Sequence, residues 1–185
     1  DVGEVLAQLI PQVEAQPRSE WLQLVADLQR EFPCTIPQEQ DPLTHYGLIN
    51  AVAACVDDEA IVTTDVGQHQ MWVAQAYPLN RPRQWLTSGF GLPAAGGAAL
   101  ANPQRKVICF SGDGSLMMNI QEMATAAENQ LDVKIILMNN EALGLVHQQQ
   151  SLFYKQGVFA ATYPGMVNFI QIAAGFGLQT CDLNN

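Results

Sequence analysis

Two short polar turns, GDGS and NNE, carry residues that could bind a metal ion and a phosphate group. Asp113 in the first turn offers a carboxylate, and Asn140 in the second offers an amide oxygen. These hard oxygen donors suit magnesium or calcium and are poor ligands for zinc. Gly114 allows the backbone to approach a bulky anion, and Ser115 opens a predicted helix whose free N–H groups favour negative charge. The turns therefore predict a site for a metal ion and a diphosphate.

Two apolar runs must position these turns. Residues 106–111 (KVICFS) precede the first turn, residues 133–138 (VKIILM) precede the second, and both patterns indicate buried strands. About two dozen residues separate the turns, enough for a helix and a return to a neighbouring parallel strand. Ligands of open α/β sheets bind at the carboxyl edge of the strands. Both turns are therefore expected to face the same ligand.

A simpler interpretation assigns the same residues structural roles. Asp113 could be a helix N-cap and residues 139–140 an ordinary turn, since Asp, Asn and Gly are common in both places. The occurrence of both turns after two buried strands favours the metal and diphosphate site. Two competing phosphate-binding motifs are absent, because the chain has neither a GxxxxGK[ST] loop nor a GxGxxG sequence after a strand.

A third polar cluster, DVGQHQ, follows the apolar run 60–64 and begins another predicted helix. Gln68 and His69 in this cluster could donate hydrogen bonds to a phosphate, or they could be polar residues of an exposed first turn. His45 and His147 lack the spacing from Cys, Asp or Glu that a zinc site requires, so we expect surface or core histidines.

The predicted fold is α/β, with a parallel sheet and helices on both of its faces. Prolines at 33, 37 and 42 mark a linker and predict a domain boundary near residues 33–43. Apolar spacing predicts helices over 2–10, 20–32, 43–55, 68–76, 116–129 and 167–175, and strands over 60–64, 106–111, 133–138 and from 178 onward. We expect the chain end to truncate this last strand and the domain.

Composition indicates a soluble globular protein, with 48% hydrophobic and 14% charged residues among 185. The formal net charge of −10 argues against nucleic acid or an anionic membrane as a partner. Four dispersed cysteines without a CxxC pair predict reduced core thiols in a cytoplasmic protein. No signal segment or membrane span is predicted, and the start at Asp1 suggests an excised piece.

Several motifs together resemble one family of thiamine-diphosphate enzymes. GDG followed by NN is similar to the signature of these enzymes, and DVGQHQMW, FGLPAA, NNEALGLV and QQSLFY resemble the large catalytic subunit of bacterial acetohydroxyacid synthase (acetolactate synthase). The resemblance covers nearly the whole chain, with the motifs in the same order and spacing. It implies a thiamine-diphosphate-binding fold over residues 41–185, with residues 1–40 ending a central FAD-type domain and its linker.

The resemblance also assigns roles to residues. Asp113, the Asn140 side chain and the Ala142 carbonyl would hold magnesium. Contacts to the rest of the cofactor would come from Gly67, Gln68, His69, Gly114 and Ser115 at the diphosphate, and from Gly144 and Leu145 near the thiazolium and pyrimidine. Leu145 stands where many relatives have Met.

The chain departs from the family pattern at three places. The family has about half a dozen more residues between Gly89 and Phe90, which include a Met beside the cofactor. A turn this short leaves little room for the cofactor, so a segment present in the natural protein is favoured over a deletion. Gly96 replaces a larger apolar residue. Gln149 stands where many members have a Trp that favours 2-ketobutyrate, so the acceptor preference stays open.

The activity that the resemblance implies is decarboxylation of pyruvate and addition of the product to a second 2-ketoacid, in branched-chain amino-acid biosynthesis. The cofactor carries this chemistry. The family activates it with a Glu on another domain of a partner subunit, so no catalytic residue is expected in this chain and the isolated chain should be inactive. FAD, a homodimer of catalytic subunits and a small regulatory subunit are implied for the full enzyme.

Three alternatives remain open at this point. The chain could belong to another thiamine-dependent decarboxylase or carboligase, such as a pyruvate oxidase or a glyoxylate carboligase, although DVGQHQMW and QQSLFY argue against this. It could instead be a non-catalytic module that binds magnesium and diphosphate. It could also be an assembly domain that docks a regulatory subunit.

Overall fold

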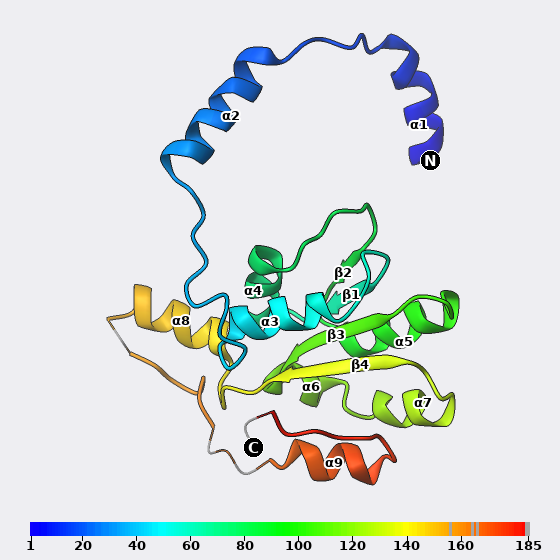
Figure 1. The fold of residues 1–185 in the computed structure, drawn as a ribbon, viewed down its shortest axis with the longest axis vertical. Coiled ribbons are helices and arrows are strands. Elements are labelled where there is room, and N and C mark those ends of the chain that lie inside the picture. Colours follow the sequence, from blue (N-terminus) through cyan, green and yellow to red (C-terminus); the bar gives the residue numbers. More distant parts are fainter. Residues whose placement is uncertain (156, 164, 166, 184–185) are drawn as a thin grey trace. The chain divides into compact units, whose positions relative to one another are not determined.

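The computed structural model describes residues 1–155, 157–163, 165 and 167–183 of the chain, drawn in Figure 1. Contacts divide it into two compact units, Asp1–Thr35 and Ile36–Asn185. The first unit consists of α1 (Val2–Leu9), the 3₁₀ turn η1 (Ile10–Gln12) and α2 (Ser19–Glu31), close to the predicted helices. None of the residues in these three elements is buried within the described chain.

The second unit is built on a parallel sheet, as the sequence predicted. Its strands are β1 (Ile61–Thr64), β2 (Trp85–Thr87), β3 (Val107–Gly112) and β4 (Val133–Met138), in the spatial order β2-β1-β3-β4. All three strand pairs are parallel. The strands run in the same direction, so their carboxyl ends meet at one edge of the sheet.

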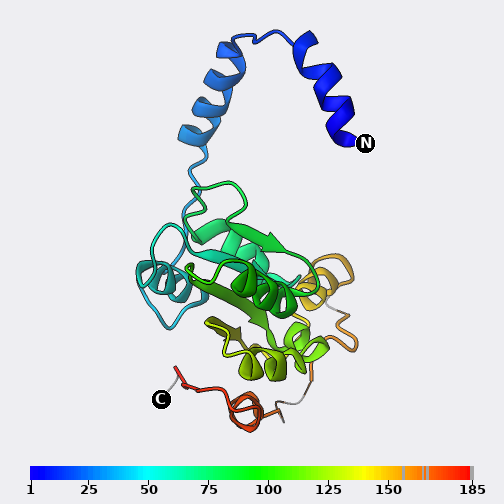
Figure 2. The same ribbon diagram turned by 90° about the vertical axis from the view of Figure 1, so that its right-hand side faces the viewer.

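Helices cover both faces of this sheet because alternate strand residues point to opposite sides. Ile61, Val107 and Cys109 pack with α5 (Gly91–Ala101), α7 (Glu122–Glu128) and α9 (Phe169–Gly175). Val62, Ile108 and Phe110 pack on the other side with α3 (His45–Ala54) and α4 (Gln68–Ala76). Figures 1 and 2 show the two helical layers on either side of the strands.

Several predicted elements differ from the observed ones. The helix expected over 116–129 is two helices, α6 (Asp113–Met118) and α7, because the buried Asn119 leaves the helix and donates to the Gly89 carbonyl at 3.2 Å. Asn favours such local bonds over a helix interior. The strand expected from residue 178 is wrong, since residues 178–183 form no strand. Helix α8 (Gly144–Phe153), β2 and α5 were not among the predicted elements.

The turn between β2 and α5 is short and continuous. Gly89 is followed directly by Phe90, whose N–H donates to Ser88 Oγ at 3.1 Å. The half dozen residues that the family pattern places here have no counterpart between Gly89 and Phe90 in this sequence. Only three residues join the strand to the helix.

The cysteines differ from the prediction of core thiols. All four are free, but only Cys109 is buried, and burial raises the pKa of its thiol to about 12. Cys34, Cys55 and Cys181 are exposed, because they lie in turns and loops rather than in strands. Within the described residues, no helix is long and apolar enough to cross a membrane.

Candidate functional site

The three polar turns identified in the sequence meet at the carboxyl edge of the sheet. Gly112 pairs with Met138, so the residues that follow β3 and β4 lie side by side. The third turn precedes α4, and Gln68 at the start of that helix accepts a hydrogen bond from Asn140 Nδ2 at 3.3 Å. The structure therefore brings together residues that are 72 positions apart in the sequence.

Asp113 begins α6 and is 1% exposed. Its Oδ1 accepts from the N–H of Gly114 at 2.9 Å, whereas its Oδ2 is buried without a hydrogen-bond partner among the described residues. A buried carboxylate oxygen normally has a partner, because leaving it unpaired costs free energy. Asp113 Oδ2 is therefore the atom best placed to coordinate a cation.

Asn140 is exposed, and hydrogen bonds fix the orientation of its amide group. Its Oδ1 accepts from the N–H of Ala142 at 3.2 Å, and its Nδ2 donates to Gln68. Gln68 Nε2 in turn donates to Gln148 Oε1 at 2.9 Å, which connects α4 to α8. An amide oxygen has two lone pairs, so Asn140 Oδ1 can bind a cation in addition to the N–H.

The imidazole of His69 lies between two glycines of the site. A Cβ atom on Gly67 would lie 2.8 Å from His69 Nδ1, and one on Gly112 would lie 2.9 Å from it. Burial lowers the pKa of His69, although the carboxylates of Asp65 and Asp113 act in the opposite direction. His69 Nε2 is buried and has no partner among the described residues, so a second polar atom at this edge is available to a ligand.

The remaining predicted residues have different surroundings. Ser115 does not direct its hydroxyl outward, because Ser115 Oγ donates to the Gly112 carbonyl at 3.1 Å and accepts from the Gly112 N–H at 3.2 Å. Gly144 and Leu145 begin α8, and a Cβ atom on Gly144 would collide with Gln68 and Asn140. Gly144 therefore allows α8 to approach the other turns closely.

Asp65 is a central residue of this edge that was not among the predicted site residues. Its carboxylate is 1% exposed, accepts from the Gly91 N–H at 2.7 Å and accepts a short hydrogen bond from Ser111 Oγ. These bonds join the end of β1 to the end of β3 and the start of α5. Its position directly after a buried strand was the only sequence signal that could have identified it.

Tyr163 also belongs to the site and was not predicted. Its hydroxyl is buried without a hydrogen-bond partner among the described residues, and a Cβ atom on Gly114 would lie 2.8 Å from it. Burial raises the pKa of Tyr163 to about 12, and the negative charge of Asp113 and a hydrogen-bond interaction with its carboxylate add to this effect, although the two side chains do not form a hydrogen bond of normal geometry. No local motif marks Tyr163, since it lies in an irregular segment after α8.

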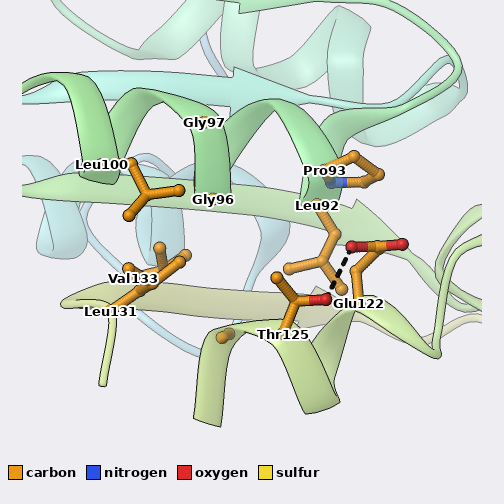
Figure 3. A pocket seen from close by; sticks show the side chains of 10 residues that line it. Leu92, Pro93, Gly96, Gly97, Leu100, Glu122, Thr125, Leu131 and Val133 are labelled. Atoms are coloured by element: carbon orange, nitrogen blue, oxygen red, sulfur yellow. Dashed lines mark hydrogen bonds between the residues drawn. The ribbon is translucent and has the colours of Figure 1, made fainter. Parts of the chain in front are cut away.

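A cavity of about 220 Å³ lies away from this edge, between α5, α7 and the start of β4 (Figure 3). Its wall contains Gly96, Gly97 and Leu131, and its polar residues Glu122 and Thr125 are hydrogen-bonded to each other at 3.1 Å. The cavity is mostly apolar, and none of the buried unpaired polar atoms of the described residues belongs to its lining. The chemistry of the predicted ligand therefore fits the sheet edge and not this cavity.

The arrangement of donors at the edge fits a divalent cation with an attached anion. Asp113 Oδ2 and Asn140 Oδ1 are oxygen ligands of the type that magnesium prefers, and magnesium usually takes few protein ligands plus phosphate oxygens and water. No cluster of three or more His, Cys, Asp or Glu that could hold a metal occurs among the described residues. A site that uses a single carboxylate would need an anionic ligand to complete it.

Comparison with known proteins agrees with this chemistry. Residues 65–185 match the family described as "Thiamine pyrophosphate enzyme, C-terminal TPP binding domain". The X-ray structure of a Mycobacterium smegmatis protein assigned as a thiamin diphosphate-dependent enzyme superposes with a TM-score of 0.64 and 25% identity. That match covers 76% of this chain and 26% of the other.

Two curated relatives are similar over nearly the whole chain. The acetolactate synthase isozyme 1 large subunit of Escherichia coli is 85% identical over 100% of this chain and 34% of its own length. The acetolactate synthase large subunit of Parasynechococcus marenigrum is 42% identical over 97% of this chain and 30% of its own length. The chain thus spans about a third of the length of these relatives.

The E. coli alignment contains gaps in this chain. It extends over 191 positions for 185 residues, so at least six positions of the relative have no counterpart here. This number agrees with the half dozen residues that the family pattern places between Gly89 and Phe90.

With the family match over residues 65–185, the chain belongs to the thiamine pyrophosphate enzymes and contains their C-terminal TPP-binding domain.

Proposed function

We propose that this chain is the cofactor-binding part of an acetolactate synthase, the activity for which its E. coli relative is named. Such an enzyme decarboxylates pyruvate and condenses the product with a second 2-ketoacid, in the biosynthesis of valine, isoleucine and leucine. When bound, thiamine diphosphate supplies the carbon nucleophile for this chemistry. The observation that carries the proposal is the buried Oδ2 of Asp113 beside Gly114, which makes no hydrogen bond of normal geometry within the described part of the chain.

Each residue of the site has a proposed task. Asp113, Asn140 and the carbonyl of Ala142 hold Mg²⁺. The diphosphate contacts, in this proposal, are Gly67, Gln68, His69, Gly114 and Ser115, with Ser115 contributing its backbone. Gly144 and Leu145 would lie near the thiazolium and pyrimidine rings. The hydrogen bonds of Asn140 support this arrangement, because they hold its amide in one orientation.

The whole enzyme needs parts that lie outside these residues. We infer that residues 1–40 end an FAD-type domain and its linker, which is compatible with the division of contacts between Thr35 and Ile36. The activating Glu, FAD, a second catalytic subunit and a small regulatory subunit complete the enzyme, which acts in the cytoplasm. The isolated chain therefore binds the cofactor weakly and does not form acetolactate from pyruvate.

Calorimetric titration of the chain with thiamine diphosphate tests the proposal. Heat of binding is expected with Mg²⁺ and not in EDTA, and Asp113→Ala and Asp113→Asn should both abolish it. Asp132→Asn is a matched control, since that carboxylate is about half exposed and precedes β4, at the opposite edge of the sheet from the turns. Binding that is independent of both Mg²⁺ and Asp113 would sink the site assignment, and acetolactate formation by the pure chain would overturn its predicted inactivity.

A further inference from the structure

A tyrosine hydroxyl lies against the turn that is proposed to hold the diphosphate. The ideal Cβ position on Gly114 is 2.8 Å from Tyr163 Oη and 2.6 Å from Leu143 Cδ2. The space that Gly114 leaves open is therefore bordered by two side chains from later in the sequence. One of these side chains is apolar, and the other ends in a hydrogen-bond donor.

The backbone fixes the position of Tyr163 relative to the second turn. The N–H of Tyr163 donates to the Glu141 carbonyl at 3.1 Å, and the N–H of Leu143 donates to the Ala161 carbonyl at 2.8 Å. Ala142 and Thr162 form the antiparallel bridge between these bonds. Tyr163 is thus attached to the NNE turn through its backbone, while its hydroxyl reaches the GDG turn.

The two unpaired atoms at this position are chemically opposite. Asp113 Oδ2 is an acceptor of the carboxylate, and Tyr163 Oη carries a donor hydrogen. Both are buried, and neither makes a hydrogen bond of normal geometry among the described residues, although burial, the charge of Asp113 and a hydrogen-bond interaction with its carboxylate together raise the pKa of Tyr163. A cation would satisfy the first atom and an anion the second, so a metal diphosphate would satisfy both.

We propose that Tyr163 is a further cofactor-binding residue, whose hydroxyl donates a hydrogen bond to a diphosphate oxygen at Gly114. This inference rests on the proposed function. The site residues named above include no Lys or Arg, in a chain with only eight such residues and a net charge of −10. Neutral donors must therefore supply much of the anion binding, and a tyrosine hydroxyl adds one.

The variant Tyr163→Phe removes the hydroxyl and keeps the ring against Gly114 and Leu143. Calorimetry with thiamine diphosphate and Mg²⁺ should show affinity about tenfold weaker than for the unchanged chain, as expected for a lost hydrogen bond to a charged group. A similar loss is expected with inorganic pyrophosphate and Mg²⁺, because the contact is to the diphosphate. Tyr154→Phe is the matched control, since Tyr154 is 69% exposed, and it should leave both affinities unchanged.

The stability of the cofactor-free chain separates binding from a structural role. Tyr163→Phe deletes a buried hydroxyl that makes no hydrogen bond of normal geometry among the described residues and interacts only weakly with the Asp113 carboxylate, so the unfolding midpoint without cofactor should stay nearly the same or rise. A lower midpoint, or unchanged affinity for both ligands, would overturn the role of Tyr163. If the unchanged chain shows no Mg²⁺-dependent binding of either ligand, the proposed function itself fails, which is a different outcome.

Discussion

Glycines occur in two regions of this domain with opposite surroundings. At the carboxyl edge of the sheet, a Cβ atom on Gly91 would lie 2.7 Å from the backbone nitrogen of Asp65, and one on Gly144 would lie 2.6 Å from Asn140 Nδ2. In α5, a Cβ atom on Gly96 would lie 3.6 Å from Leu131 Cδ1, and one on Gly97 would meet nothing within 4 Å. The edge is filled around Gly91 and Gly144, whereas the middle of α5, at Gly96 and Gly97, borders a cavity.

The polar atoms of the two regions differ in the same way. The edge buries polar atoms without partners among the described residues, at Asp113, His69 and Tyr163, which costs stability in the absence of a ligand. The polar side chains beside the cavity, Glu122 and Thr125, satisfy each other. Tight packing around unpaired polar atoms therefore indicates a binding site, while an open apolar cavity indicates unfilled space.

The largest expected effect at the edge comes from Asp65→Ala. Loss of the buried carboxylate leaves the Gly91 N–H and the Ser111 hydroxyl without their acceptor, so we expect the free energy of unfolding to fall by about 3 kcal/mol. Urea unfolding followed by circular dichroism measures this change. Asp132→Ala is the control, because the salt bridges of Asp132 with Lys106 and Lys134 are exposed and should contribute less than about 1 kcal/mol. Equal losses in the two variants would show that the Asp65 bonds do not hold the edge together.

A smaller loss is expected from Gly91→Ala. The new methyl group would lie 2.7 Å from the Asp65 nitrogen and 2.8 Å from the Thr64 carbonyl carbon, and backbone atoms cannot move aside as side chains do. We expect the free energy of unfolding to fall by about 2 kcal/mol, as for other overpacked sites. Gly89→Ala provides a neighbouring control, since a Cβ atom there meets nothing within 4 Å. If both variants unfold alike, the close packing at this edge is not rigid.

The positions of the GDGS and NNE turns could be predicted from the sequence because they depend on the local apolar pattern of the strands that precede them. Observed β4 and α4 have the predicted bounds, Val133–Met138 and Gln68–Ala76. A buried strand, a crossover and a second buried strand then bring the turns together without further information. The apolar pattern alone is therefore enough to place Asp113 and Asn140 on one edge of the sheet.

The elements that the sequence did not predict depend on distant contacts. Helix α5 is rich in Ala and Gly and has no clear apolar period, so its pattern does not distinguish a helix from a loop. Asn119 interrupts the helix expected over 116–129 by bonding to Gly89, which is 30 residues away. Tyr163 reaches Gly114 from an irregular segment, and no spacing rule relates the two.

The buried histidine at the edge predicts a dependence of stability on pH. Burial lowers the pKa of His69 in the folded chain below its usual value of 6.5, so the unfolded chain takes up the proton first. Stability is fully present above pH 6.5 and falls as the pH decreases toward the lowered pKa. Because one proton is involved, the free energy of unfolding can change with pH by at most about 1.4 kcal/mol per pH unit.

Unfolding by urea at several pH values between about 7.5 and 5.5 checks this dependence. His69→Gln should reduce the dependence of the free energy of unfolding on pH. His45, whose pKa is also lowered by burial, should account for part of the pH dependence that remains. If the variant and the unchanged chain have the same slope, His69 does not titrate differently in the two states. The edge would then lack the buried neutral imidazole that distinguishes it from the cavity region.

The smallest expected effect, and the only gain, comes from filling the space beside α5. Gly97→Ala adds a methyl group to an exposed position of the helix, where less conformational freedom in the unfolded chain should raise the free energy of unfolding by about 0.5 kcal/mol. Gly96→Ala has the same effect on the unfolded chain and also places its methyl group in ordinary contact with Leu131. We therefore expect the free energy of unfolding to rise by about 1 kcal/mol. Thermal and urea unfolding of both variants measure the difference, which isolates the burial of one methyl group in the cavity. Equal gains would mean that the cavity contributes nothing, and a loss at Gly96 would mean that α5 is as tightly packed as the sheet edge.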